Sequence, residues 1–324
     1  MPARIALEPE AIAFNGTSEA DCKASHDRFF EVWERFGVLV VPEDKDSLNR
    51  AIERLPQSYR KKWKNALKSS RFRVIEKDLP DFSGINVEAD LLAFSEKADL
   101  VSLEDARGVC VCISDENYSK VYEEAELEVC RFAFLDRSHA VTSRKDAWDT
   151  LIYKGERRED IWKNKFSGLC RYAKRISLID RYAGKNLIKS FGKGEVSGVE
   201  IFLRRLSSIN ECIDSKTINL FVSDEETEKN ALVRTMSKVL EGSRRNVRSF
   251  HVHICPDKIF GAAAHDRFVR FDNLITALGK GLSVFEDETC QENYSCQLFI
   301  DRDEKFRNEV EGFIMKNSHK ETLI

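Results

Sequence analysis

Three polar residues in one short stretch, His265, Arg267 and Asp272, have the types and the spacing needed to handle a phosphate group. Residues two apart on a β-strand point to the same face, so His265 and Arg267 would leave that face about 7 Å apart. An imidazole attacks phosphorus or moves protons, and a guanidinium binds non-bridging oxygens with two parallel hydrogen bonds. Asp272 is the candidate third group, which would hold the histidine in one tautomer. The spacing predicts a phosphodiester site on a strand.

The segments around this stretch are predicted to form an α/β domain. Alternating apolar residues predict strands at residues 250–254 and 265–272, and apolar runs predict further strands at 176–179, 217–222 and 298–300. Helical patterns lie between them. Asp180 and Arg181 follow the strand at 176–179, at the carboxyl end where sites of α/β sheets collect.

The spacing His265-x-Arg267-x4-Asp272-x6-Gly279 resembles the motif of the phospholipase D superfamily, with arginine in place of lysine. The similarity is closer still to the phospholipase D-like domain that ends the microtubule-interacting-and-trafficking (MIT) domain proteins. That domain carries His-Asp-Arg, Arg-Phe and Gly-Arg-Gly-Leu, which are matched here by His265-Asp266-Arg267, Arg270-Phe271 and Gly279-Lys280-Gly281-Leu282. The resemblance covers about residues 160–315. It implies a mixed-sheet α/β fold whose substrate-binding residues are Arg270, Lys280, Asp180 and Arg181.

Three functions are open for this stretch. An enzyme of the phospholipase D type needs two His/Lys sets, and because this chain carries one, a homodimer would have to share the site across its two-fold axis. A binding module would hold a phosphate of nucleic acid, nucleotide or lipid headgroup without cleaving it. Arg267 favours this second function, because a guanidinium is always charged and does not give up a proton. In the third, His265 is a packed side chain of a scaffold. The His265 site requires no cofactor.

The first half of the chain is predicted to form another α/β domain, with carboxylates where strands end. Strands are expected at residues 5–9, 38–41, 109–113 and 131–135, with a helix at 118–127. Glu8, Asp115 and Asp136 lie at strand ends, and this arrangement over residues 1–140 resembles the PIN-like nucleases. The resemblance implies a Rossmann-like fold in which these three residues bind Mg²⁺ or Mn²⁺. The alternative is that Asp115 caps the following helix and Asp136 opens a turn.

A basic run occupies the predicted helix at residues 58–73. Its lysines Lys61, Lys62 and Lys64 are candidate contacts to nucleic acid, because cations neutralise phosphates and the interleaved Tyr59 and Trp63 could stack on bases. The alternative is a solvated helix face whose Trp63 lies in the core.

Composition restricts the class of protein. A chain of 324 residues fits two domains, which we place at residues 1–150 and 151–324. A net charge of −3 means that nucleic acid can only be bound by local patches. Nine cysteines without regular metal-ligand spacing, and no signal peptide, predict a cytoplasmic protein in a reducing compartment. No apolar run approaches the roughly 20 residues of a membrane span.

A nuclease-like half joined to a phosphate-handling half is typical of prokaryotic defence and toxin effectors. The sequence therefore predicts a nucleic-acid-directed effector, a nuclease or phosphodiesterase that forms a homodimer. The alternative is a non-catalytic module for phosphate binding and dimerisation. Nucleic acid is the expected partner and a membrane surface the less favoured one, while the sequence indicates no particular protein partner.

Overall fold

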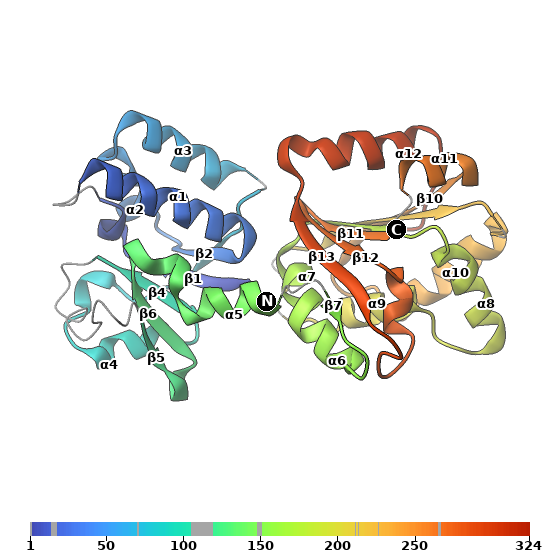
Figure 1. Ribbon diagram of the computed structural model, residues 1–324, viewed down its shortest axis with the longest axis horizontal. Helices are drawn as coiled ribbons and strands as arrows, with labels where there is room; N and C mark the ends of the chain where they lie inside the picture. Colours follow the sequence, from blue (N-terminus) through green and yellow to red (C-terminus); the bar gives the residue numbers. More distant parts are fainter. Residues whose placement is uncertain are drawn as a thin grey trace. The chain divides into compact units, whose positions relative to one another are not determined.

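The computed structural model describes residues 2–13, 18–69, 71–104, 119–147, 151–210, 212, 214–225, 227–264 and 267–324. It is a mixed α/β structure in which two mixed sheets are surrounded by helices (Figure 1). The chain divides into two compact units, one formed by residues 2–147 and the other by Trp148–Ile324. Each unit has its own sheet and its own hydrophobic core.

The first unit is built on a six-stranded sheet in the order β3-β2-β1-β4-β6-β5. The strands are parallel except for β5, which pairs antiparallel with β6 at one edge. Their bounds are Ala3–Leu7 (β1), Gly37–Pro42 (β2), Val74–Lys77 (β3), Leu100–Leu103 (β4), Ser119–Tyr122 (β5) and Leu127–Arg131 (β6). The chain extends the sheet from β1 to β3 on one side and then crosses to β4 on the other. The topological switch point therefore lies between β1 and β4.

Helices cover both faces of this sheet because its central strands are apolar on both sides. Three helices, α1 (Glu19–Arg35), α2 (Asp46–Glu53) and α3 (Gln57–Lys68), pack on one face around the buried rings of Phe29, Trp33 and Trp63. The short α4 (Glu88–Leu91) and the 3₁₀ turns η2 (Phe82–Gly84) and η3 (Leu92–Phe94) cover the other. The remaining elements are η1 (Pro9–Ile12), η5 (Glu123–Ala125), η6 (Phe132–Arg137) and α5 (His139–Ala147).

Two predicted elements of this unit are wrong, and the predicted strand at residues 109–113 lies outside the described residues. The helix expected at 118–127 is the β5–β6 hairpin, which turns through Glu126 in the left-handed region at φ 49°. The strand expected at 131–135 is the 3₁₀ turn η6, because β6 already ends at Arg131. Leu127 and Val129 are buried at alternate positions, and this packing outweighs the helical propensity of the glutamates before them.

The second unit contains an eight-stranded sheet in the order β14-β10-β9-β8-β11-β12-β13-β7. β8, β9 and β10 are parallel, and all other neighbours are antiparallel. The bounds are Leu151–Ile152 (β7), Arg175–Ile179 (β8), Lys216–Ser223 (β9), Val247–Cys255 (β10), Arg267–Phe271 (β11), Leu274–Leu278 (β12), Tyr294–Ile300 (β13) and His319–Thr322 (β14). The strands predicted at 176–179, 217–222, 250–254 and 298–300 are confirmed.

Helices lie on both faces of this sheet as well (Figure 1). One face carries α6 (Arg158–Ile161), the π-helical turn η7 (Trp162–Phe166), α7 (Ser167–Tyr172), α8 (Ala183–Lys193), α9 (Gly198–Ser207) and α10 (Lys229–Glu241). The other carries α11 (Asp257–Ala263) and α12 (Gly312–Lys316), which continues the π-helical turn η10 (Arg307–Glu311). Two 3₁₀ turns, η8 (Gly281–Phe285) and η9 (Arg302–Glu304), complete the unit.

Among the described residues, each unit has one buried histidine that is neutral at pH 7. In the first unit, Nδ1 of His26 accepts a hydrogen bond of 3.0 Å from the Trp63 indole, so Nε2 carries the proton and donates to the Ile12 carbonyl at 3.0 Å. In the second, His253 stacks on Phe221 with ring centroids 4.6 Å apart. Burial lowers the pKa of His26 and of His253 to about 4. Protonation of either ring would place a charge in a buried position.

We therefore expect both units to lose stability as the pH falls from 6.5 to 4. In this window the unfolded chain binds the two protons and the folded chain does not, so the free energy of unfolding decreases on acidification. At pH 5 the decrease is about 2 kcal/mol for each histidine. Urea unfolding at pH 7 and pH 5 measures it, and His26→Gln should remove the part that belongs to the first unit. An equal pH dependence in wild type and variant would contradict the assignment.

Candidate functional site

Five strands of the second unit meet at one edge of its sheet. The carboxyl ends of β8, β9 and β10 lie together because these strands are parallel. β11 runs antiparallel to β8, and Phe268 near its start pairs with Ile179 at the end of β8. β12 returns to the same edge, where Leu278 pairs with Arg267. This register places Arg267 and the turn after Leu278 beside Asp180, at the carboxyl edge where α/β sheets bind ligands.

Arg267 and Asp180 form the centre of this edge. Nε of Arg267 lies 3.8 Å from Oδ1 of Asp180, and its Nη1 donates a hydrogen bond of 2.8 Å to the Gly279 carbonyl. The buried Asp180 carboxyl accepts from the backbone N–H groups of Tyr182 and Leu282, each at 3.0 Å. Burial raises the pKa of Asp180, and these backbone donors act in the opposite direction. The Arg267 side chain is 26% exposed, so it is fixed on one side and accessible on the other.

Gly281 lets the turn after β12 approach this pair. Its backbone is in the left-handed region at φ +60°. A Cβ at this position would lie 2.9 Å from Cγ of Asp180 and 2.5 Å from Cδ of Arg267. Leu282 can therefore donate its N–H to Asp180 only because residue 281 has no side chain.

The ring of Tyr182 contacts two guanidinium groups at this edge. Cζ of Arg267 is 5.1 Å from the ring centroid and Cζ of Arg181 is 5.5 Å from it. Tyr182 as a whole is 38% exposed. Cation–π contacts at exposed sites contribute about 0.5–1 kcal/mol each, so Tyr182 helps to hold Arg267 in one orientation.

Arg181, predicted to bind substrate, is already paired with carboxylates. Its Nε donates to Asp257 at 2.7 Å, its Nη2 donates to the second oxygen of the same carboxylate, and Glu225 lies 3.4 Å away. Ser223 donates a further hydrogen bond of 2.7 Å to Asp257. This network joins the ends of β8 and β9 to the start of α11.

Lys280 is paired in the same way. Its ammonium donates to the Tyr294 hydroxyl at 2.8 Å and lies 3.3 Å from Glu292. The hydrogen bond to Tyr294 raises the pKa of Lys280, and Glu292 raises it further. Of the three cations described at this edge, Arg267 is therefore the one with the most bonding capacity left for a ligand.

The other two residues of the predicted catalytic set are His265 and Asp272. His265 lies outside the described residues. Asp272 lies at the other end of β11 from Arg267, about 16 Å away at the rise of a strand. It forms the β11–β12 turn at φ 54°, and its carboxylate accepts from the backbone N–H groups of Lys174 and Arg175, each at 3.0 Å. The role of Asp272 as the third group of the site is corrected to that of a turn residue.

Arg270, predicted to bind substrate, belongs to the core. Its guanidinium forms a bidentate pair with Glu311, with Nη2 2.6 Å from Oε2. Nη1 donates to the Asp272 carbonyl, and Nη2 also lies 3.3 Å from the Ser177 hydroxyl. Both charged side chains are buried, with exposures of 6% and 3%. We correct the assignment of Arg270 to a structural ion pair that ties η10 to the sheet.

Two of the three carboxylates predicted to bind metal, Glu8 and Asp136, lie within the described residues. Glu8 follows β1 at the switch point of the first sheet, is fully buried, and accepts the Glu104 backbone N–H at 2.7 Å. Asp136 lies in η6 with Oδ1 3.6 Å from Nε of Arg28. Asp115 lies outside the described residues. Among the side chains that the structure describes, no three of the His, Cys, Asp and Glu type are grouped to hold a metal ion.

The three predicted lysines of α3 differ in their contacts. Lys62 forms an ion pair of 2.6 Å with Asp27, and Lys64 pairs with Glu53. Lys61 is exposed and has no such contact within the described residues. Trp63 is fully buried, so it packs in the core and is not available to stack on a base.

Comparisons with known proteins do not assign the chain. No protein-family model matches it, and no curated protein matches it either. None of the helices that the structure describes combines the length and the apolar character needed to cross a bilayer. The functional argument therefore rests on the geometry of the carboxyl edge of the second sheet.

Proposed function

We propose that the second unit binds nucleic acid through a backbone phosphate held by Arg267. The observation that supports this proposal is that the Arg267 guanidinium is held in one orientation and is partly exposed. One side is fixed by the Gly279 carbonyl, by Asp180 and by the ring of Tyr182, and the side chain remains 26% exposed. A preoriented arginine suits a phosphate because its planar fork can donate two parallel hydrogen bonds.

Binding without cleavage is supported over phosphodiesterase chemistry by two features. Asp272 lies at the far end of β11, so the third group of the expected catalytic set is missing from the edge. Arg267 also replaces the motif lysine and cannot supply a proton. The predicted homodimer was required by a shared active site, and a binding module of this kind can act with one copy. The resemblance to the MIT-associated phospholipase D-like domain fits the same proposal.

Arg267→Ala is expected to weaken binding of a fluorescent single-stranded DNA or RNA oligonucleotide about ten- to a hundredfold. The reason is the loss of one charged hydrogen-bond donor group, which contributes roughly 1.5–3 kcal/mol. Fluorescence anisotropy of the full chain at fixed salt measures the change. The matched control is Arg204→Ala, since Arg204 is an exposed arginine of the same unit that pairs within its own helix with Glu200.

Additional arms of this titration separate the alternatives. If the wild type binds anionic lipid vesicles but not oligonucleotides, and Arg267→Ala weakens the vesicle binding, the ligand of the Arg267 site is a lipid headgroup. Equal affinities of wild type, Arg267→Ala and Arg204→Ala for every ligand would remove the site. If the wild type cleaves the oligonucleotide in the presence of EDTA and His265→Ala does not, the phosphodiesterase function is supported instead.

A metal-dependent nuclease in the first unit is the second candidate, and the position of Glu8 favours it. This carboxylate lies at the carboxyl end of β1, next to the switch point where sheets of this topology bind ligands. The PIN-like resemblance proposed for residues 1–140 would add Asp115 and Asp136, with Mg²⁺ or Mn²⁺ as the metal. The test is to incubate the full chain with the same oligonucleotide in Mn²⁺ or in EDTA and to analyse the products on a denaturing gel. Cleavage in Mn²⁺ that EDTA abolishes supports it, and an intact oligonucleotide in both excludes it.

A further inference from the structure

The helical hairpin formed by α2 and α3 carries a strong local positive charge. Residues 46–68 contain seven cations and two anions, a balance of +5 in a chain whose net charge is −3. The cations are Arg50, Arg54, Arg60, Lys61, Lys62, Lys64 and Lys68, and the anions are Asp46 and Glu53. A field of this sign attracts polyanions, provided that the cations are not neutralised within the fold.

Part of this charge is neutralised, and the structure shows which part. Glu53 of α2 is 3.4 Å from Arg60 and pairs with Lys64, both of α3. The hydrogen bond from Lys64 is the main cause that lowers the pKa of Glu53. Lys62 pairs with Asp27 of α1. Glu53 therefore joins α2 to α3 and does not compensate the arginines on its own helix.

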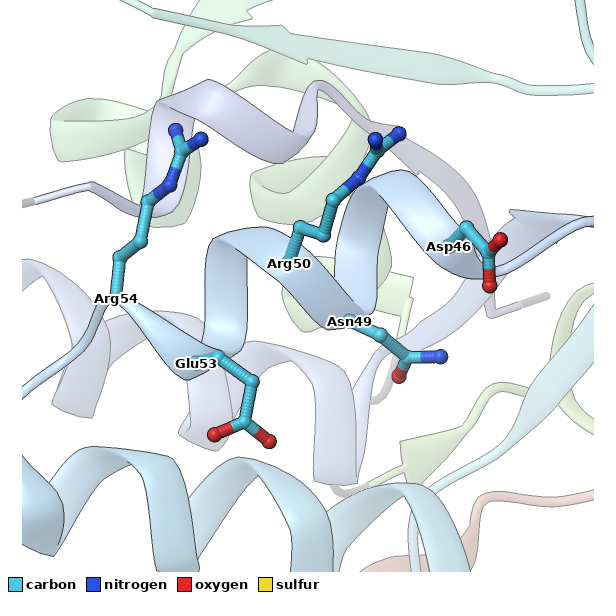
Figure 2. A pocket seen from close by; sticks show the side chains of 5 residues that line it. All are labelled: Asp46, Asn49, Arg50, Glu53 and Arg54. Carbon is cyan, nitrogen blue, oxygen red and sulfur yellow. The ribbon is translucent and has the colours of Figure 1, made fainter.

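Two further cations of the hairpin are Arg50, in α2, and Arg54, which directly follows α2. Both are exposed, and the described residues offer neither guanidinium an ion pair or a hydrogen bond. Figure 2 shows the two side chains extending to the same side of α2, with Asn49 and Glu53 on the other. Together with Asp46, Asn49 and Glu53 they line a shallow hollow, and one helical turn, about 6 Å, separates the two arginines. The two guanidiniums, with their free donors, form a ridge along one side of the helix.

We propose that the Arg50–Arg54 ridge is a binding surface for the sugar–phosphate backbone of nucleic acid, independent of base sequence. Arginine forks donate to phosphate oxygens, and each phosphate contact releases condensed counterions, which makes such binding depend strongly on salt. Lys61 and Lys68 of α3 are also exposed and without ion pairs in the described structure, but they are not part of this ridge, because Arg50 and Arg54 extend away from the side on which Glu53 meets α3. The proposal shares its ligand class with the proposed function but uses a different unit and different residues.

The test is a salt titration of the full chain with a fluorescent single-stranded DNA of mixed sequence. Arg50→Gln combined with Arg54→Gln should reduce affinity roughly tenfold near 0.1 M salt and reduce the slope of log K against log salt by about 1.5. The control is Lys189→Gln with Lys193→Gln, which removes the same charge from two exposed positions one turn apart on α8. The control should leave the slope unchanged. Because both arginines are exposed, the thermal unfolding midpoint should stay within a degree or so of wild type.

The results separate this inference from the proposed function. A slope that the arginine pair does not change, while Arg267→Ala weakens binding, overturns the inference and leaves the Arg267 site standing. If the arginine pair reduces the slope and Arg267→Ala leaves DNA binding unchanged, the ridge is supported and the Arg267 site is contradicted. If the arginine pair and the lysine control lose DNA affinity equally, net charge alone explains the effect, and this overturns the ridge. Absence of DNA binding by the wild type also overturns it, and an acidic protein would then be the partner to test.

Discussion

Gly281→Ala is expected to destabilise the second unit by about 3 kcal/mol or more and to abolish phosphate binding at the carboxyl edge. A side chain at φ +60° strains the backbone, and the added Cβ would collide with Asp180 and Arg267. Asp180 cannot move away without losing the N–H donors of Tyr182 and Leu282. The substitution therefore displaces the guanidinium that the proposed site depends on. Hydrogen exchange of the β8 and β11 amides in the full chain measures the loss of stability within this unit.

Gly192→Ala is the control for that substitution. Gly192 lies in α8, its φ is not in the left-handed region, and nothing is within 4 Å of the position of a new Cβ. Replacement of glycine by alanine in an exposed helix stabilises it by up to about 1 kcal/mol. The two alanine substitutions should therefore have opposite signs. A Gly281→Ala protein with normal protection and normal binding would show that the close approach at residue 281 is not needed.

Arg270→Met is expected to cost about 3–5 kcal/mol, because it leaves the Glu311 carboxylate buried without its partner. Glu311→Leu should cost a similar amount for the converse reason, with a guanidinium left in the core. Both changes keep most of the side-chain volume, so the loss reports the unpaired charge rather than a cavity. Hydrogen exchange or urea unfolding of the full chain measures each single variant.

The double substitution Arg270→Met with Glu311→Leu provides the control. Removing both charges relieves the penalty, so most of the stability lost in either single variant should return. The Arg267 site should bind normally in the double variant, since Arg270 lies in the core and not at the edge. Single variants that cost less than about 1 kcal/mol, or a double variant that loses the sum of both, would contradict a tightly coupled buried pair.

The strands of the second unit were predictable because their burial follows the sequence periodicity. Phe250, Val252 and Ile254 enter one core, while His251 and His253 lie on the other face. The end of β11 was not predicted. The pattern of alternation was extended through Asp272, although Asp272-Asn273 between two apolar runs is a hairpin signal. That one misjudged turn placed Asp272 in the site and gave it a catalytic role.

The pairing of cations could not be predicted, because it depends on contacts distant in sequence. Lys62 and Asp27 are 35 residues apart, and Arg270 and Glu311 are 41 apart. Of the three predicted lysines, Lys62 and Lys64 are paired and Lys61 has no ion pair within the described residues. Arg50 and Arg54 beside the predicted basic run were overlooked. Tyr182 was also missed as a support for Arg267. Its exposed position at the start of α8 gives no periodic signal. The Gly279-Lys280-Gly281 segment was used only for the family resemblance, and the close approach of Gly281 to Asp180 was not predicted.

The most direct test of the central claim is to observe the Arg267 guanidinium itself during a titration with single-stranded DNA. Arginine Nε–Hε resonances of the full chain report it, and the Arg267 signal is identified by its absence in Arg267→Lys. We predict that this signal shifts in proportion to the fraction of DNA bound, while the signal of Arg204, which pairs with Glu200, stays in place. An Arg267 signal that does not move when the DNA is fully bound would contradict the proposed site.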